Sequence, residues 1–126
     1  SHFDSTILPL RPGLVLFNSD RLSPDRYPEI FKSWDKIWFG GDQLKVSDHY
    51  SPNGVSPCSS AIGLNFLSVN PDLVICDVIQ DELRRELAKH KIDTIGLPMR
   101  HSRTLSGGFH CVTLDVKRKG NLESYF

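Results

Sequence analysis

Residues 62–97 read IGLNFLSVNPDLVICDVIQDELRRELAKHKIDTIGL, and the order of elements in this stretch decides the fold. Two apolar runs, at 62–69 and 73–76, predict strands, although Gly63 weakens the first of them. Asn70-Pro71-Asp72, which separates the two runs, is typical of a turn. The first half of the stretch therefore predicts two strands joined by a tight connection.

The second half of the stretch predicts a helix and a closing strand. Ile79, Leu83 and Leu87 fall on one face of a helix over residues 80–91. Acidic side chains lie early in this helix and basic ones late, which matches the helix dipole. Residues 93–97 then read as a strand, so the whole stretch is a strand–strand–helix–strand unit.

The same order of elements precedes this stretch. Residues 6–10 and 14–17 predict two strands, and Pro12-Gly13 between them suits a type II turn. Residues 23–34 predict a helix, and residues 36–39 predict its closing strand.

The helix predicted at 23–34 rests on its first turn and on an aromatic stripe. Ser23 suits the N-cap and Pro24 the first helical position. Pro28 is late for a first turn, so a start nearer Pro28 is an alternative. The stripe consists of Tyr27, Ile30, Phe31 and Trp34.

A third unit opens at residues 109–116, where Phe109, Cys111 and Thr113 alternate as in a strand, but no helix follows. A repeated supersecondary unit indicates a closed or stacked array. The alternative is a single α+β sandwich whose halves match by chance. The pattern predicts an α/β protein of two to two and a half such units, divided into modules at about 1–57 and 58–126.

Composition narrows the class of protein. The chain has 126 residues, and its 15 basic and 15 acidic side chains cancel, which argues against a protein that coats nucleic acid or acidic membranes. No apolar run approaches the ~20 residues of a membrane helix. Three widely spaced cysteines argue against a secreted disulfide framework. These features favour one soluble domain in a reducing compartment.

Residues 40–57 form a long segment rich in Gly, Ser, Asp and Pro. A loop of this length is unusual in a compact domain, so a functional lid or a mobile segment is one interpretation. A solvated loop without a role is the other.

Candidate chemistry begins with Gly107-Gly108, which precede Cys111. Glycines let a ligand or another backbone approach closely, and a cysteine beyond them can act as a nucleophile. The alternative is a buried structural cysteine, which is the interpretation we give Cys76 in its apolar strand.

Two further places carry polar groups. His2 and Asp4 point to one face of an extended chain, and His is a natural proton shuttle, although a frayed end is the simpler interpretation. Arg21, with hydroxyls from Ser59 and Ser60, suits a carboxylate ligand. The alternative is a surface arginine and a serine cap.

Metal and cofactor sites are weakly supported. Neighbouring His110 and Cys111 would point to opposite faces of a strand, and the sequence has no CxxC pair, so we expect no metal. The basic cluster at 117–119 reads as a solvated turn. No phosphate loop or dinucleotide fingerprint occurs, and we expect no cofactor.

Taken together, these places resemble the glycine amidinotransferase family of arginine-modifying enzymes. The resemblance lies in four segments and runs nearly end to end: HFDST at 2–6, PGLVLFNSDR at 12–21, Ser59-Ser60, and GGFHCVTLDVKRKG at 107–120. That family has the pentein fold, an α/β propeller of five strand–strand–helix–strand modules. The resemblance implies that this chain covers only the C-terminal third of such an enzyme.

The resemblance also implies a role for each candidate residue. Cys111 would be the nucleophile and His2 the general acid and base, while the third, acidic member of the family's triad lies outside this chain. Asp4 would hold the substrate guanidinium. Arg21 and Ser60 would bind the carboxylate of the donor, with Ser59 close by.

The implied reaction moves the amidino group of L-arginine through a covalent amidino-cysteine to an amine acceptor and releases ornithine. The chain departs from the family's pattern at Ser106 and Ser1, and the segment from Arg21 to Ser59 is somewhat longer than in the animal glycine enzymes. The acceptor therefore stays open between glycine and an amine of natural-product or toxin assembly. Two alternatives are a guanidine hydrolase of the same fold and a non-catalytic fragment.

The expected partners are arginine, the acceptor amine, the N-terminal remainder of the enzyme and a second copy in a homodimer, without nucleic acid or membrane. The expected location is cytoplasmic, or mitochondrial for an animal glycine enzyme.

Overall fold

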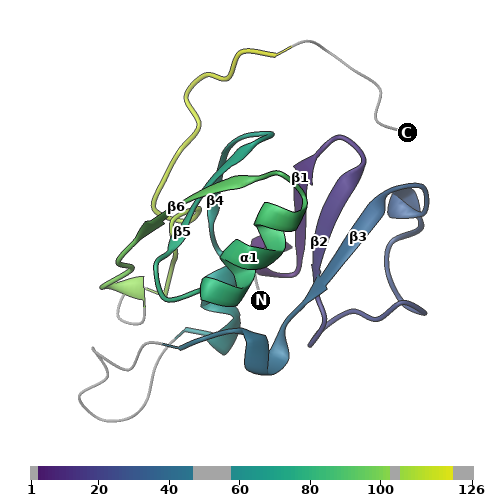
Figure 1. Ribbon diagram of the computed structural model, residues 1–126, viewed down its shortest axis with the longest axis horizontal. Coiled ribbons are helices and arrows are strands. Elements are labelled where there is room, and N and C mark those ends of the chain that lie inside the picture. Colours follow the sequence, from purple (N-terminus) through teal and green to yellow (C-terminus); the bar gives the residue numbers. More distant parts are fainter. Residues whose placement is uncertain (1–2, 47–57, 103–105, 121–126) are drawn as a thin grey trace.

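The computed structural model describes residues 3–46, 58–102 and 106–120, which form two three-stranded sheets (Figure 1). The first sheet contains β1 (Ile7–Arg11), β2 (Leu14–Asn18) and β3 (Asp35–Phe39). The second contains β4 (Leu67–Asn70), β5 (Leu73–Asp77) and β6 (Asp93–Leu97), with helix α1 (Asp81–Lys89) between the last two strands. Short 3₁₀ helices are η1 (Phe3–Ser5), η2 (Glu29–Phe31), η3 (Gly41–Gln43) and η4 (Ser60–Leu64).

The two sheets repeat one topology. In each, the first two strands are antiparallel, the second and third are parallel, and the middle strand of the sheet is the second in sequence. Leu14 and Leu73 hold the same register positions, so the sheets are offset by 59 residues. The predicted repeat is thereby confirmed, and the single sandwich is wrong.

The middle strand of the first sheet is buried on both faces. All five residues of β2 are buried. Leu14 and Leu16 point to one core, whereas Val15 and Phe17 point to a second core with Phe31 and Trp34. Burial on both faces explains why residues 14–17 are continuously apolar rather than alternating.

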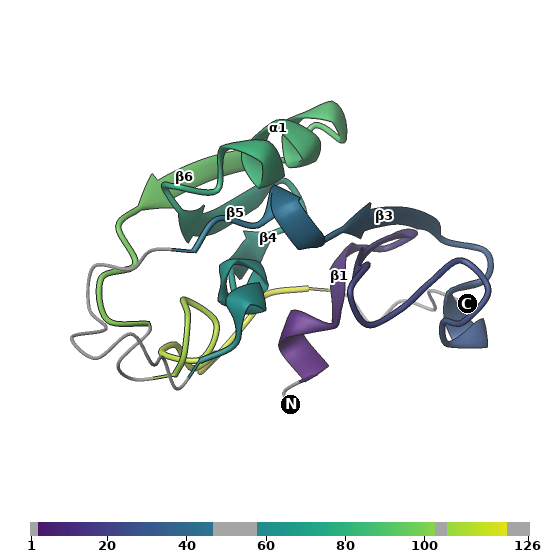
Figure 2. The ribbon, with the colours of Figure 1, turned by 90° about the horizontal axis from the view of Figure 1, so that it is seen from below.

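The larger core joins the two sheets through α1, which covers one face of the second sheet (Figure 2). Leu83 and Leu87, predicted to share a helix face, are fully buried in it, and the predicted charge pattern at the two helix ends is present. The members of this core are Leu8, Leu10, Leu14, Leu16, Ile37, Phe39, Leu64, Phe66, Val74, Cys76, Leu83, Leu87 and Ile92.

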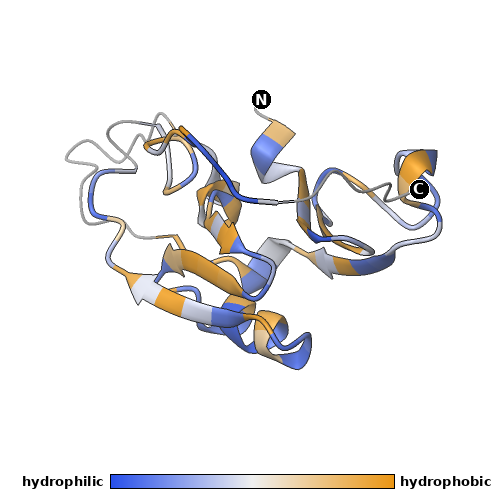
Figure 3. Cartoon of the chain, turned by 90° about the horizontal axis from the view of Figure 1, so that it is seen from above, coloured by the Kyte–Doolittle hydropathy of each residue, from blue (hydrophilic) through white to orange (hydrophobic). Residues whose placement is uncertain are grey.

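The other face of the second sheet is uncovered. Ile95 is 44% exposed and Leu97 is 42% exposed, and bands of apolar colour alternate with paler ones along strand β6 (Figure 3). Ile37, which takes the register position of Ile95 in the first sheet, is only 3% exposed. The same face of the repeated unit is therefore buried in one sheet and open in the other.

The helix predicted at 23–34 is wrong. Ser23 closes a turn with Arg26, and only the 3₁₀ helix Glu29–Phe31 follows, with Pro28 at its N-cap. Proline lacks the N–H that a continuing helix needs and disfavours helical backbone in the residue before it. The aromatic side chains still pack on the sheet, but Ile30 is exposed.

Two predicted strands also differ from the structure. The run at 62–69 begins as the 3₁₀ helix η4, and only Leu67–Asn70 is a strand. Residues 109–116 form a turn followed by extended chain without strand pairing among the described residues. A strand forms only where a neighbour pairs with its backbone. This segment therefore does not join a sheet, and its apolar side chains at Val112, Leu114 and Val116 are exposed.

The turns agree with the sequence. Gly13 has a φ of +81°, as the type II interpretation requires, and Asn70 accepts a hydrogen bond from the N–H of Asp72. The predicted loop at 40–57 contains η3, and its residues 47–57 lie outside the described part of the chain. Within the described residues, no helix has the length and apolar character that crossing a membrane requires.

Candidate active site

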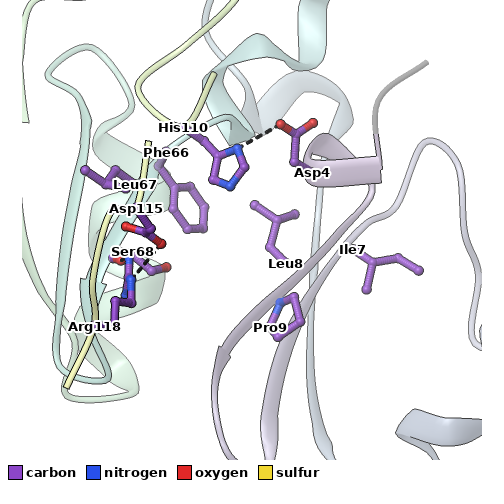
Figure 4. A pocket seen from close by; sticks show the side chains of 10 residues that line it. All are labelled: Asp4, Ile7, Leu8, Pro9, Phe66, Leu67, Ser68, His110, Asp115 and Arg118. Atoms are coloured by element: carbon purple, nitrogen blue, oxygen red, sulfur yellow. Dashed lines mark hydrogen bonds and ion pairs between the residues drawn. The ribbon is translucent and has the colours of Figure 1, made fainter. Parts of the chain in front are cut away.

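The carboxylate of Asp4 lies at the centre of the candidate site. Its Oδ2 accepts a hydrogen bond from Asn65 Nδ2 at 2.9 Å, and His110 Nδ1 lies 3.0 Å away (Figure 4). The thiol of Cys111 donates to the same oxygen at 3.5 Å. The fold thus brings η1, the end of η4 and the turn after Gly108 to one atom.

Asn65 holds this arrangement together and is fully buried. Its Oδ1 accepts hydrogen bonds from the N–H groups of Gly108 at 2.9 Å and Cys111 at 3.1 Å, and its carbonyl accepts from the N–H of His110. The sequence analysis missed this residue. The signal that could have revealed it is a single polar residue between apolar Leu64 and Phe66.

Gly107 and Gly108 lie where other atoms of the chain come too close for a side chain. A Cβ on Gly107 would lie 2.8 Å from the Cβ of Cys111, and one on Gly108 would lie 2.6 Å from the carbonyl oxygen of Asn65. The close approach predicted for these glycines is therefore confirmed, and the neighbour is the protein's own chain.

The three cysteines differ in exposure. Cys111 is exposed, whereas Cys58 and Cys76 are buried. Burial raises the pKa of the Cys76 thiol to about 11, although the nearby Arg84 guanidinium lowers it. The structural role predicted for Cys76 agrees with its burial, and Cys111 is the accessible thiol.

His110 and Cys111 do not point to opposite faces, so the prediction made from strand alternation is wrong. Both side chains approach Oδ2 of Asp4 because residues 109–112 form a turn rather than a strand. His110 is a second residue of the site that the sequence analysis missed, and the error came from the predicted strand.

Arg21 lies in a hydroxyl-lined position near the same elements. Its guanidinium donates to Thr6 Oγ1 at 2.7 Å, Ser5 Oγ at 3.1 Å and Ser59 Oγ at 3.3 Å. No carboxylate within residues 3–46, 58–102 and 106–120 pairs with it. The hydroxyls fix the planar group while its positive charge stays available to an acidic ligand.

Helix η4 connects the Arg21 group to the Asp4 group. Ser59 is its N-cap and accepts from the N–H of Ala61, Ser60 is its exposed first residue, and Asn65 follows its last residue. A 3₁₀ rise of about 2 Å per residue separates Ser59 from Asn65 by roughly 12 Å. The structure brings Arg21 and Ser59 together and places Asp4 and Cys111 near the far end of this helix.

One oxygen of Asp4 has no partner in the part of the chain that the structure describes. Its Oδ1 is buried and accepts no hydrogen bond from the described residues. An unsatisfied buried acceptor costs about 1–3 kcal/mol, and a charged one costs more. The site therefore favours a ligand that donates hydrogen bonds and carries positive charge.

A pocket adjoins the Asp4–His110 pair (Figure 4). Ile7, Leu8 and Pro9 of β1 form one wall, and residues 66–68 form another. Asp115 and Arg118, joined by an ion pair of 2.7 Å, also line it. His2 lies outside the described residues.

Comparison with known proteins finds amidinotransferases that are similar to this chain. No protein-family model matches the chain. The inosamine-phosphate amidinotransferase 1 of Streptomyces glaucescens is 46% identical over 133 residues, which cover 99% of this chain and 35% of that protein. This chain is a homologue of the amidinotransferases. It spans about a third of the length of the relatives it matches.

Other amidinotransferases are also similar to this chain in sequence and in structure. The mitochondrial glycine amidinotransferase of Xenopus tropicalis is 34% identical over 127 residues, with 99% of this chain and 28% of that protein covered. The structure of the Streptomyces griseus inosamine-phosphate amidinotransferase matches with a TM-score of 0.87 at 46% identity, over 99% of this chain and 35% of its own.

A second solved structure of an amidinotransferase also matches this chain. An amidinotransferase of saxitoxin biosynthesis from Microseira wollei matches with a TM-score of 0.83 at 32% identity, over 100% of this chain and 34% of its own. The chain therefore has the architecture of pentein modules, as the resemblance implied, and the two repeated sheets are modules of that α/β propeller.

Proposed function

We propose that this chain is part of an enzyme that transfers the amidino group of L-arginine to an amine acceptor and releases ornithine. One observation carries the proposal. Asp4 presents a buried oxygen that has no partner among the described residues, and its other oxygen lies 3.5 Å from the exposed thiol of Cys111. A guanidinium is a planar cation with several N–H donors, so it would satisfy the carboxylate and lie beside the sulfur.

In the proposed first step, Asp4 holds the guanidinium and directs its carbon at the sulfur of Cys111. The positive charge of the ligand favours the thiolate, which attacks this carbon. A bond forms between sulfur and carbon, and the bond from that carbon to the chain nitrogen of arginine breaks. His2 is the proposed general acid that protonates this nitrogen, which leaves as the amine of ornithine.

In the proposed second step, the acceptor amine attacks the amidino-cysteine. The acceptor loses a proton to His2, the carbon–sulfur bond breaks, and the thiolate of Cys111 is restored. The order of events predicts ping-pong kinetics, because ornithine leaves before the acceptor reacts.

Arg21, Ser59 and Ser60 are the proposed partners of the donor's carboxylate. Arg21 is already oriented by three hydroxyls, and two of them, Ser5 and Thr6, directly follow Asp4 in the chain. A ligand with an acidic group at one end and a guanidinium at the other could reach both Arg21 and Asp4, which supports arginine as the donor.

The proposed acceptor is an amine of natural-product assembly. Support comes from relatives named for inosamine phosphate, which reach 46% identity, against 34% for a glycine enzyme. We further propose that the remainder of the enzyme supplies the third member of the triad. The homodimer and the cytoplasmic location stay predictions.

The test is the covalent intermediate. Purified protein incubated with L-arginine, without acceptor, should gain about 42 Da on Cys111 and release ornithine. Peptide mass spectrometry locates the adduct. Cys111→Ala should abolish it, and Cys58→Ala is the matched control that should keep it. An adduct on another cysteine would overturn the proposal, and citrulline in place of ornithine would identify a guanidine hydrolase.

The acceptor is tested separately. Once the adduct has formed, addition of an inosamine phosphate, glycine or lysine shows which amine discharges it. Faster discharge by glycine than by the inosamine phosphate would contradict the proposed acceptor class.

A further inference from the structure

We propose that Asp4, His110 and Cys111 form a binding site for a soft divalent cation such as Zn²⁺. These residues contribute a carboxylate, an imidazole and a thiol, and their ligand atoms all lie within 4.8 Å of one another. Thiolate, imidazole and carboxylate are the groups that bind zinc in proteins. The expectation of no metal rested on opposite side-chain directions in a strand, and the turn at 109–112 removes that objection.

The distances are close to those of a tetrahedral site. Zinc bonds of about 2.0–2.3 Å at tetrahedral angles place neighbouring ligand atoms about 3.4–3.6 Å apart. Asp4 Oδ2 lies 3.5 Å from Cys111 Sγ and 3.0 Å from His110 Nδ1. The third pair, His110 Nδ1 and Cys111 Sγ, lies within 4.8 Å. Three protein ligands would leave the fourth position to water.

The surroundings orient the ligands. Buried Asn65 donates to Asp4 Oδ2 and accepts from the N–H of Cys111, so two of the three ligands share one rigid neighbour. Such second neighbours hold ligands in place and strengthen metal binding. The unpartnered Oδ1 of Asp4 is an independent sign that this position receives a positively charged group.

Binding requires a defined exchange of protons. Cys111 binds as the thiolate, so its proton is released to solvent. His110 binds through the Nδ1 lone pair, so its ring proton lies on Nε2 in the metal-bound form. The carboxylate and thiolate together balance the two positive charges of the metal. Net binding therefore exchanges one metal ion for one proton.

The metal site overlaps the proposed guanidinium position. Both ligands need the Asp4 carboxylate and the Cys111 sulfur, so only one can be bound at a time. This exclusion rests on the proposed function, whereas metal binding itself does not. Zinc should therefore block the adduct with arginine, and a chelator should restore it.

Cobalt(II) gives a readout independent of activity. Titration of the purified, reduced protein with Co²⁺ should produce a thiolate-to-cobalt charge-transfer band with one ion per chain, which Zn²⁺ then displaces. Cys111→Ser should remove the band. His110→Gln and Asp4→Asn should weaken Co²⁺ binding by roughly tenfold or more.

Matched controls exclude other ligands. Cys58→Ser, His90→Gln and Asp72→Asn replace the same residue types elsewhere and should leave the band unchanged. A circular dichroism spectrum like that of the parent shows that each variant is folded. A band that survives Cys111→Ser, affinity unchanged in both His110→Gln and Asp4→Asn, or no band at a stoichiometric ratio would overturn the proposal.

The two proposals fail separately. Cobalt binding at Cys111 without an arginine adduct would remove the proposed function and keep the metal site. An adduct on Cys111 without cobalt binding would do the reverse.

Discussion

Asn65 and Gly108 are in contact at the centre of the site, and each constrains the other. The buried amide of Asn65 bonds both to Asp4 and to the turn that carries Cys111. Gly108 has no room for a side chain, because a Cβ there would meet the Asn65 carbonyl oxygen at 2.6 Å. Asn65 therefore positions both the carboxylate of Asp4 and the turn that carries the thiol, and Gly108 leaves room for this contact.

Gly108→Ala should displace the turn and disrupt the site. A clash with backbone cannot be relieved by a side-chain rotation, so we expect a loss of about 1–3 kcal/mol in the free energy of unfolding. Urea titration followed by circular dichroism measures it. Gly120→Ala is the control, since a Cβ there meets nothing within 4 Å and should change stability little. Equal stability of the two variants would contradict this account of the turn.

At the scale of elements, the last residues of β2 and β5 make the same type of hydrogen bond with different chemical groups. Asn18 and Asp77 are buried, and each accepts a hydrogen bond from the N–H two residues further on. Burial raises the pKa of Asp77, although the N–H groups of Ile79, Met99 and Val78 lower it. The second module thus has a titratable carboxyl group where the first has an amide.

Asp77→Asn should stabilise the protein at neutral pH. A folded-state pKa above the unfolded value means that the native state binds more protons between the two values, so stability falls as pH rises through that window. Asparagine does not titrate, so Asp77→Asn does not lose stability in this way. In thermal unfolding, Asp77→Asn should have a higher midpoint temperature than the parent at neutral pH, and the two midpoints should agree at acidic pH. Asp25→Asn, at an exposed position, is the control, and its midpoint should not depend on pH relative to the parent. A difference independent of pH would contradict the role of the charge.

Local patterns predicted the elements whose causes are local. Helix α1 follows from apolar spacing and charge, and the turn at Gly13 from a backbone conformation that glycine adopts freely. The segment 23–34 has the spacing of a helix, but Pro28 interrupts it, and only the 3₁₀ helix Glu29–Phe31 forms after this proline. The turn at 109–112 depends on Asn65, more than 40 residues away, so no local pattern could place His110 and Cys111 on one side.

At the scale of the molecule, the repeat shows which surface is incomplete. Ile37 and Ile95 take the same register position in their sheets, yet Ile37 is 3% exposed and Ile95 is 44% exposed. The first sheet buries this face against the core that contains α1 of the second module. By the same geometry, we expect the open face of the second sheet to be covered in a protein as long as the relatives that this chain matches.

The equivalent pair provides the test. In this chain, Ile37→Ala should cost about 2–5 kcal/mol of unfolding free energy, as for a buried isoleucine, whereas Ile95→Ala should cost less than about 1 kcal/mol. In a longer protein that contains this chain and the covering part, the cost of Ile95→Ala should rise toward that of Ile37→Ala, because the same side chain would then leave a cavity. Urea unfolding of both variants in both proteins measures the four values. The cost of Ile95→Ala could instead stay small in the longer protein. That result would show that this face remains in contact with solvent. The register match between Ile95 and Ile37 would then carry no information about how the modules pack.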